Sequence, residues 1–178
     1  MNIAFITNGS LSIGFGHISR TRMLYSFFTS KNNSVKIIVP ESCIFSFDGD
    51  FVVVRSFCEQ DLEFLESDYD VVIIDSIESD YDSLSWLSKT KLFIVSITLF
   101  MFDLKKRFEH ISFFPSVKDS EIITASRTKI YVGRDYLTFR EEFNHSYFQI
   151  NPDSKKIIVT MGGTDPYSLT LKVLKSLV

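Results

Sequence analysis

The sequence predicts an α/β fold with a doubly wound, mainly parallel, Rossmann-like sheet, and two observations lead to this prediction. Short, continuous apolar runs rich in β-branched residues recur along the first half of the chain. Polar segments of helical character separate these runs. Continuous apolar runs are typical of strands that are buried on both faces, and the strand–helix alternation implies right-handed crossovers between parallel strands.

The expected elements follow from these runs in chain order. Strands are predicted at Ile3–Ile6, Val35–Val39, Val52–Val54, Val71–Ile74 and Leu92–Ile97. Helices are predicted at His17–Lys31, Glu59–Glu66 and Tyr81–Ser88. The following part is less regular, with short strands expected at Ile111–Phe114, Ile122–Thr124 and Ile130–Val132, and a short helix or connection at Asp135–Phe143. Residues 1–143 would form the first domain.

The chain changes character after residue 143. Residues 144–156 are polar and contain the turn signal Asn151-Pro152-Asp153-Ser154, so they are the expected linker. Residues 157–178 then form a second strand–glycine turn–helix unit, with an apolar strand at Ile157–Met161, a turn at Gly162–Pro166 and a helical run from Tyr167 to Val178. We expect this unit to be the start of a truncated second, nucleotide-binding domain.

Composition argues against several classes of protein. The net charge is −3 with acids and bases interspersed, so no basic surface predicts nucleic-acid binding, and Lys105-Lys106-Arg107 is expected to be a solvated loop. The apolar stretch Leu92–Phe102 is too short to span a bilayer, and no signal peptide is apparent. Cys43 and Cys58 are typical of reduced thiols in a cytoplasmic protein. We expect no metal and no cofactor.

The most informative stretch is Gly14-Phe15-Gly16-His17-Ile18-Ser19-Arg20, between the first strand and the first helix. This arrangement directs backbone N–H groups and the positive end of a helix dipole toward an anion. Histidine at the start of the helix suits a general base, although it could merely cap or pack. Gly14 and Gly16 could admit a ligand close to the backbone or serve only the turn. Arg20 could contact phosphate or form a surface salt bridge.

Four segments together resemble the N-terminal half of GT-B-fold nucleotide-sugar enzymes, nearest to the UDP-sugar hydrolase family of the pseudaminic acid pathway. They are Gly14–Arg20, Tyr69–Asp75, Val132–Phe143 and Ile158–Pro166. The chain departs from that family near the expected sugar pocket. Ser96-Ile97-Thr98 stands where the family usually has an aspartate pair, and Ile77 stands where a tyrosine is favoured.

The resemblance implies roles for individual residues. His17 would be the base that activates water for attack on the anomeric carbon, with UDP leaving. Independently of the resemblance, Asp75 closes a buried strand at the edge where functional side chains collect, so it could position the sugar or the His17 imidazole, with capping of the next segment as an equal alternative. The remaining substrate-binding candidates are Gly14, Gly16, Arg20 and Tyr136, and the nucleotide- or phosphate-binding candidates are Gly162, Gly163, Thr164 and Asp165. Hinge packing is expected for Arg140.

The implied function is a UDP-sugar hydrolase or glycosyltransferase-like protein of surface-sugar (nonulosonic acid) biosynthesis. Two alternatives remain open: a non-catalytic fragment or binding module that keeps the fold, and a GT-B glycosyltransferase with another acceptor. A dehydrogenase is disfavoured because Gly9, Gly14 and Gly16 do not form the GxGxxG fingerprint. The expected partners are a UDP-sugar ligand and a second copy of the chain, held through the C-terminal tail.

Overall fold

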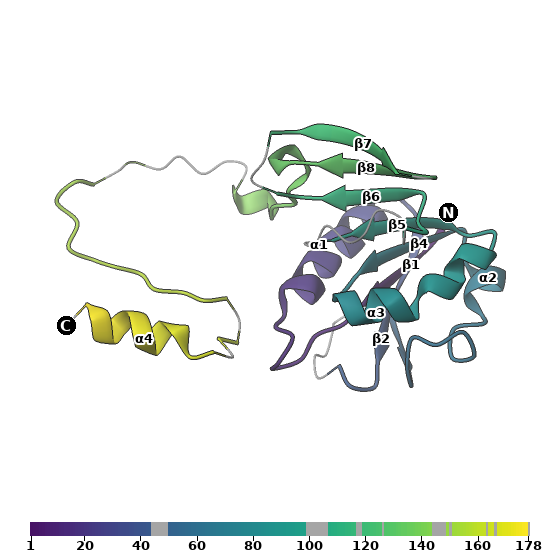
Figure 1. The fold of residues 1–178 in the computed structure, drawn as a ribbon, viewed down its shortest axis with the longest axis horizontal. Coiled ribbons are helices and arrows are strands. Elements are labelled where there is room, and N and C mark those ends of the chain that lie inside the picture. Colours follow the sequence, from purple (N-terminus) through teal and green to yellow (C-terminus); the bar gives the residue numbers. More distant parts are fainter. Residues whose placement is uncertain are drawn as a thin grey trace.

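A computed structural model describes residues 1–43, 50–98, 107–116, 119–125, 127–143, 149, 151–162, 164–165 and 167–177. Eight strands form one sheet in the order β3-β2-β1-β4-β5-β6-β8-β7 (Figure 1). Their bounds are β1 Asn2–Thr7, β2 Ser34–Pro40, β3 Phe51–Val54, β4 Val71–Asp75, β5 Phe93–Ile97, β6 Ile111–Phe114, β7 Glu121–Ala125 and β8 Thr128–Val132. The helices are α1 Gly16–Ser30, α2 Leu65–Asp68, α3 Glu78–Ser83 and α4 Leu169–Ser176, with 3₁₀ turns η1 Ser85–Lys89, η3 Arg134–Tyr136 and η4 Glu141–Phe143.

The sheet confirms the predicted fold class. Neighbouring strands run parallel except at the edge, where β7 and β8 form an antiparallel pair. The strand order reverses between β1 and β4, which pair in register from Ile3 opposite Val71 to Thr7 opposite Asp75. In open sheets of this kind, ligands bind beyond the carboxyl ends of the strands at such a reversal. The fold therefore places the end of β1 and the end of β4 at the expected ligand edge.

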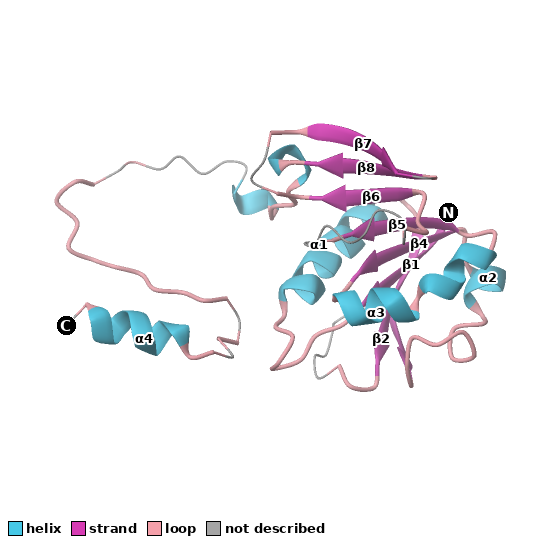
Figure 2. Ribbon diagram, viewed as in Figure 1, coloured by secondary structure: helices cyan, strands magenta, loops and turns pink. Residues whose placement is uncertain are grey.

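Each face of the sheet is covered by its own apolar layer, as Figure 2 shows for the helices. On one face Ile3, Phe5 and Ile73 pack with Ile18 of α1. On the other face Ala4 and Ile74 pack in a layer that also takes in α2, α3 and η1. Because strand residues alternate between the faces, Thr7 and Asp75 belong to the side that carries α1.

Two of the predicted helices are shorter or displaced. The helix expected at Glu59–Glu66 covers only Leu65–Asp68, because Glu59 and its neighbours form i+3 turns instead. Ser56 Oγ also donates to Asp61, a local bond that competes with helix formation. The helix expected at Tyr81–Ser88 is divided into α3, which begins earlier at Glu78, and the tighter turn η1.

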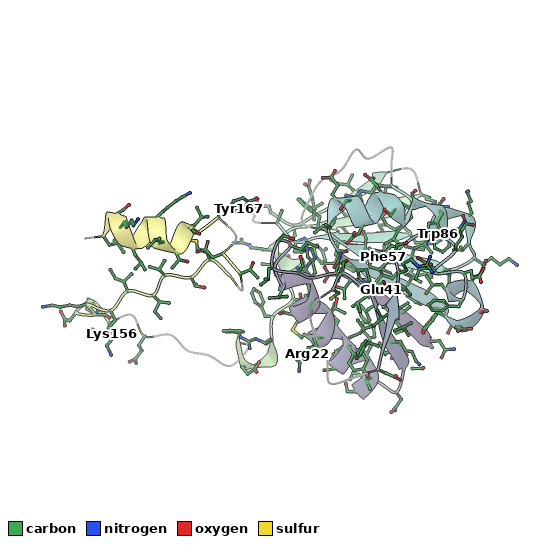
Figure 3. The ribbon with its side chains drawn as sticks, turned by 90° about the horizontal axis from the view of Figure 1, so that it is seen from below. Arg22, Glu41, Phe57, Trp86, Lys156 and Tyr167 are labelled. Atoms are coloured by element: carbon green, nitrogen blue, oxygen red, sulfur yellow. The ribbon has the colours of Figure 1, made fainter. Side chains whose placement is uncertain are left out.

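The tail differs most from the prediction. Residues 157–161 are not a strand, because none of the described strands pairs with them, and Ile158 is 90% exposed. The second helix forms but is limited to Leu169–Ser176. Figure 3 shows the tail, marked by Lys156 and Tyr167, apart from the layers that carry Phe57 and Trp86. Much of the predicted linker lies outside the described residues.

Within the described part of the chain, every helix is too short or too polar to traverse a bilayer.

Candidate functional site

Three polar side chains meet at the carboxyl edge of the sheet. Asp75, the last residue of β4, accepts hydrogen bonds from two residues of α1. Its Oδ1 lies 2.7 Å from His17 Nδ1 and 2.6 Å from Arg20 Nη2, and its Oδ2 lies 2.7 Å from Arg20 Nε. Asp75 is fully buried, whereas His17 retains 9% exposure. The fold therefore brings Asp75 together with two residues that are more than fifty positions away in the sequence.

The local pattern explains this meeting. Val71 and Ile73 pack on the α1 side of the sheet, so Asp75 at the next alternate position points to the same side. Helix α1 begins at Gly16, directly after the loop that follows β1, and β1 is the neighbour of β4. His17 and Arg20 are three positions apart in the first turns of α1, so both face the end of β4.

The short contact between His17 and Asp75 fixes the tautomer of the imidazole. A hydrogen lies between Nδ1 and Oδ1, since two unprotonated acceptors at 2.7 Å would repel each other. In the neutral ring Nε2 then carries the lone pair, and no described residue hydrogen-bonds to it. The guanidinium of Arg20 balances the charge of the buried carboxylate, which would otherwise be costly to desolvate. The arrangement suits proton abstraction at Nε2.

The loop after β1 is held by a second polar group that the sequence analysis missed. Asn8 Oδ1 accepts the Gly9 N–H at 2.8 Å, while Asn8 Nδ2 donates to Asp80 at 3.0 Å. The same oxygen of Asp80 accepts the Ser76 hydroxyl at 2.5 Å. Asp80 thus joins the loop after β1 to the loop after β4, the two strands whose ends carry the site.

The two predicted glycines of this loop have different roles. Gly14 has φ 87°, a left-handed conformation that favours glycine, and its N–H closes a turn on Ser10. Gly16 shows no positive φ, and a β-carbon there would meet nothing within 4 Å. The turn requires Gly14, whereas the fold does not require Gly16. The interpretation that Gly16 leaves room for a ligand is therefore still a proposal.

The second glycine loop approaches the first. A β-carbon built on Gly14 would lie 3.7 Å from Thr164 Oγ1. Asp165 caps α4, because its carboxylate accepts the N–H groups of Leu169 and Thr170 at 2.8 and 2.9 Å. Hydrogen bonding with Thr170 lowers the pKa of Asp165. Gly162 has φ 84°, and the predicted site residue Gly163 lies outside the described residues.

An open groove of about 270 Å³ adjoins the cluster. Gly16, Ser19, Arg20 and Met23 of α1 form one wall, and Leu137–Arg140 with Phe143 and Pro115 form the other. Of these, sequence reasoning had named only Gly16 and Arg20 as site residues, and it had expected Arg140 to pack at a hinge. Tyr136 is not in the groove, and its ring packs with Phe113 and Tyr131 at 5.9 and 5.3 Å.

A buried ion pair corrects one prediction. Arg107, expected in a solvated loop, is only 5% exposed and donates to Glu109 at 2.7 Å. Ser96 donates to the same oxygen of Glu109, and the Tyr81 hydroxyl donates to the other. Burial tends to raise the pKa of Glu109, but hydrogen bonds from Tyr81 and Arg107 outweigh it and lower the pKa. Ser96, expected near a sugar pocket, belongs to this interior network.

Among the residues that the structure describes, no three or more histidine, cysteine, aspartate or glutamate side chains lie close enough together to hold a metal ion. The described Cys43 and Cys58 are free thiols.

Comparisons with known proteins leave the activity open. No protein-family model matches the chain. The chain is similar to an uncharacterized protein of Methanocaldococcus jannaschii, MJ1062, with 29% identity over 213 residues. This alignment spans 99% of the chain but only 40% of the archaeal protein.

A solved structure from Methylobacillus flagellatus, provisionally described as an NAD-dependent epimerase/dehydratase, gives a TM-score of 0.39 at 10% identity. The matched region comprises 55% of this chain and 36% of the Methylobacillus chain. A similarity at this level supports no assignment of activity.

Proposed function

We propose that this chain carries the catalytic base of an enzyme that releases UDP from a UDP-sugar. The observation that supports the proposal is the buried Asp75 carboxylate holding His17 Nδ1 at 2.7 Å, which leaves Nε2 as the basic nitrogen. A carboxylate that orients a histidine in this way is a recurrent feature of general-base sites. Its position beyond the strand ends at the β1–β4 reversal is where ligands of such sheets bind.

In the proposed reaction, His17 Nε2 removes a proton from water while the water oxygen bonds to the anomeric carbon of the sugar. The bond between that carbon and the UDP oxygen breaks, and its electron pair leaves with UDP. Asp75 keeps the imidazole in the required tautomer and stabilises the imidazolium that forms. Arg20 keeps the carboxylate of Asp75 in place through two N–H groups.

The two glycine loops would take the diphosphate. Backbone N–H groups at the start of α1 suit an anion, and Thr164 of the second glycine loop lies beside Gly14. Because the chain spans 40% of the length of the relative named above, the activity of the whole protein is also a proposal, and further nucleotide contacts would come from a second domain. Nonulosonic acid biosynthesis is the pathway that we infer from the resemblance of the four segments.

The test is the rate of UDP release from UDP-sugars by the wild-type chain and by a version extended through a second domain. We expect His17→Asn to reduce turnover by about two to four orders of magnitude, the usual scale for a lost general base. Circular dichroism of the variant controls for folding. Full activity in His17→Asn would exclude His17 as the base. UDP release that requires an added acceptor would indicate a glycosyltransferase, and absence of UDP-sugar binding would indicate a non-catalytic module.

A further inference from the structure

The ends of β1 and β4 carry a second polar cluster, on the side of the sheet that carries α3. Thr7 and Asp75, the last paired residues of the two strands, belong to the α1 side. Because side chains alternate along a strand, the residues that follow them, Asn8 and Ser76, face the α3 side. Both donate to the same carboxylate oxygen, Oδ2 of Asp80 in α3, at 3.0 and 2.5 Å. One side chain therefore ties the two strand ends together.

A series of contacts connects Asp80 to the helix that carries His17. Asn8 is only 5% exposed, and while its Nδ2 donates to Asp80, its Oδ1 accepts the Gly9 N–H at 2.8 Å. Gly9 lies directly against Ile18 of α1, because a β-carbon built on Gly9 would be 2.4 Å from Ile18 Cδ1 and 3.0 Å from its Cγ1. Ile18 is fully buried and is the neighbour of His17 in the chain. The start of the loop is thus bonded to α3 and packed against the first turn of α1.

The geometry of the catalytic pair depends on where α1 begins. His17 belongs to α1 and Asp75 to β4, so the 2.7 Å contact between them requires the start of α1 to stay at a fixed distance from the end of β4. The bridge through Asp80 links the same two elements by a separate route. A displacement of about 1 Å at a catalytic group can reduce a rate about a hundred-fold. The bridge is therefore placed where a small movement would matter.

We propose that Asp80 is a positioning residue for His17, acting through Asn8 and Gly9. The carboxylate suits this role because one oxygen accepts two donors, and a hydrogen bond to a charged acceptor is stronger than one to a neutral group. Without it the buried amide of Asn8 loses its acceptor, and the start of the loop loses its attachment to α3. The role rests on the proposed release of UDP, for which it adds a residue that does not contact the substrate.

The kinetic test removes the bridge with Asp80→Ala in the 178-residue chain and in the version extended through a second domain. We expect kcat for UDP release to fall by about ten-fold or more while KM stays within about two-fold of wild type, since the base moves and the binding groups do not. The matched control is Asp82→Ala, which removes an exposed carboxylate from the same helix and should change neither constant. Tyr81→Phe destabilises the same helix with the bridge intact, so an equal fall in its kcat would overturn the proposal.

A reciprocal exchange tests the bridge itself. Asn8→Asp alone sets two carboxylates against each other at the 3.0 Å contact, so it should reduce kcat at least as much as Asp80→Ala. Adding Asp80→Asn restores the contact in the opposite direction. The introduced amide donates to the introduced carboxylate, and its oxygen accepts from Ser76. We expect the double variant to recover to within about three-fold of wild type, because the two positions are coupled. A folded double variant that does not recover would overturn the proposal.

A spectroscopic measurement needs no substrate and uses the 178-residue chain. In the wild type, the ¹⁵N shifts of the His17 ring should show one tautomer, with the hydrogen on Nδ1. Asp80→Ala should move the two ring-nitrogen shifts toward each other and speed hydrogen exchange of the Gly9 amide by about ten-fold or more. The exchange of residues 8 and 80 should reverse both changes, and Asp82→Ala should cause neither. A fall in kcat without a change in the ring shifts would overturn the action on His17.

These measurements separate the positioning role from the proposed function. An unchanged kcat in folded Asp80→Ala would overturn the positioning role and leave UDP release standing. Where no form of the chain releases UDP, the proposed function fails and the ring shifts decide. Shifts that change in Asp80→Ala and return in the double variant support the positioning of His17, and unchanged shifts overturn it. If Asp80→Ala does not fold, Asn8→Asp and the double variant decide by the same readouts.

Discussion

Asp75 is shared between a histidine and an arginine, and this sharing determines what each of them can do. Arg20 was a candidate for direct contact with phosphate, yet two of its nitrogens are committed to Asp75 at 2.6 and 2.7 Å. Its chief role in the described structure is therefore to hold the carboxylate that orients His17. Any contact with a ligand would use the N–H groups that remain on the groove side.

Removing Arg20 should disturb the site without removing the base. We predict that Arg20→Gln lowers UDP release by about ten-fold or more, because the buried carboxylate loses a charge-assisted pair and His17 loses its fixed orientation. Arg22→Gln is the matched control, since Arg22 is exposed two positions along the same helix. Steady-state kinetics of both variants is the measurement, and equal effects from the two would argue against the positioning role.

The two glycines at the site should respond differently to alanine. Gly14→Ala should lower the free energy of unfolding by about 1–2 kcal/mol, because its φ of 87° is unfavourable for a residue with a β-carbon. Gly16→Ala should leave stability nearly unchanged, since a β-carbon there meets nothing within 4 Å. Urea denaturation of both variants gives the comparison. A larger loss for Gly16→Ala would show that the turn was assigned incorrectly.

At the scale of elements, the buried network around Glu109 joins α3 to β5 and β6. The Tyr81 hydroxyl donates to Glu109, and burial together with the nearby carboxylate raises the pKa of Tyr81 far above its ordinary value. Tyr81 therefore stays protonated and remains a donor. Because the pKa of Glu109 is lowered in the folded chain, its ionised form contributes stability above the usual value of 4.5, and this contribution is lost as the pH falls through and below that value.

Tyr81→Phe should therefore reduce stability by about 1–3 kcal/mol at neutral pH, the cost of removing one donor from a buried charge. The reduction should shrink as the pH falls below 4.5, where Glu109 begins to take up a proton. Urea unfolding at several pH values measures it, with Tyr167→Phe as an exposed control. A loss that stays constant across this range would contradict the assigned role of the hydroxyl.

The elements of the sheet were predictable from sequence, but their long-range contacts were not. Continuous apolar runs such as Val71–Ile74 predicted buried parallel strands correctly, since that signal is local. Arg107 is buried because it pairs with Glu109 and with Ser112 of β6. The run of three basic residues in the sequence gives no information about these partners. The strand expected at Ile157–Met161 did not form, because an apolar run forms a strand only where a neighbouring strand can pair with it, and the described strands offer none there.

The site was predictable in part. The glycine turn and the position of Asp75 at a strand end identified the edge of the sheet, and the structure places His17 and Asp75 in contact there. The groove could not be predicted, because its second wall comes from an irregular segment, Leu137–Arg140, that lacks a periodic pattern. Asp80 was missed because bracing two loops leaves no sequence motif.

At the scale of the whole molecule, the tail carries the largest group of exposed apolar side chains among the described residues. Ile157 and Ile158 are 71% and 90% exposed, and α4 presents Leu171 and Leu174 to solvent. Such surface favours association. We predict a homodimer in which the tail contributes to the contact, so deletion of the residues after Pro152 should leave the sheet folded and the chain monomeric. Light scattering tests this, and a monomeric parent or an unchanged oligomer after deletion would contradict it.

The central claim is that His17 and Asp75 act as one unit in UDP release, and a double-mutant cycle tests it most directly. UDP release is measured for the wild type, His17→Asn, Asp75→Asn and the double variant, with folding checked by circular dichroism. Since paired catalytic groups are strongly non-additive, the account predicts that the double variant is no slower than about the worse single variant. Losses that multiply, or either single variant retaining wild-type rates, would contradict it.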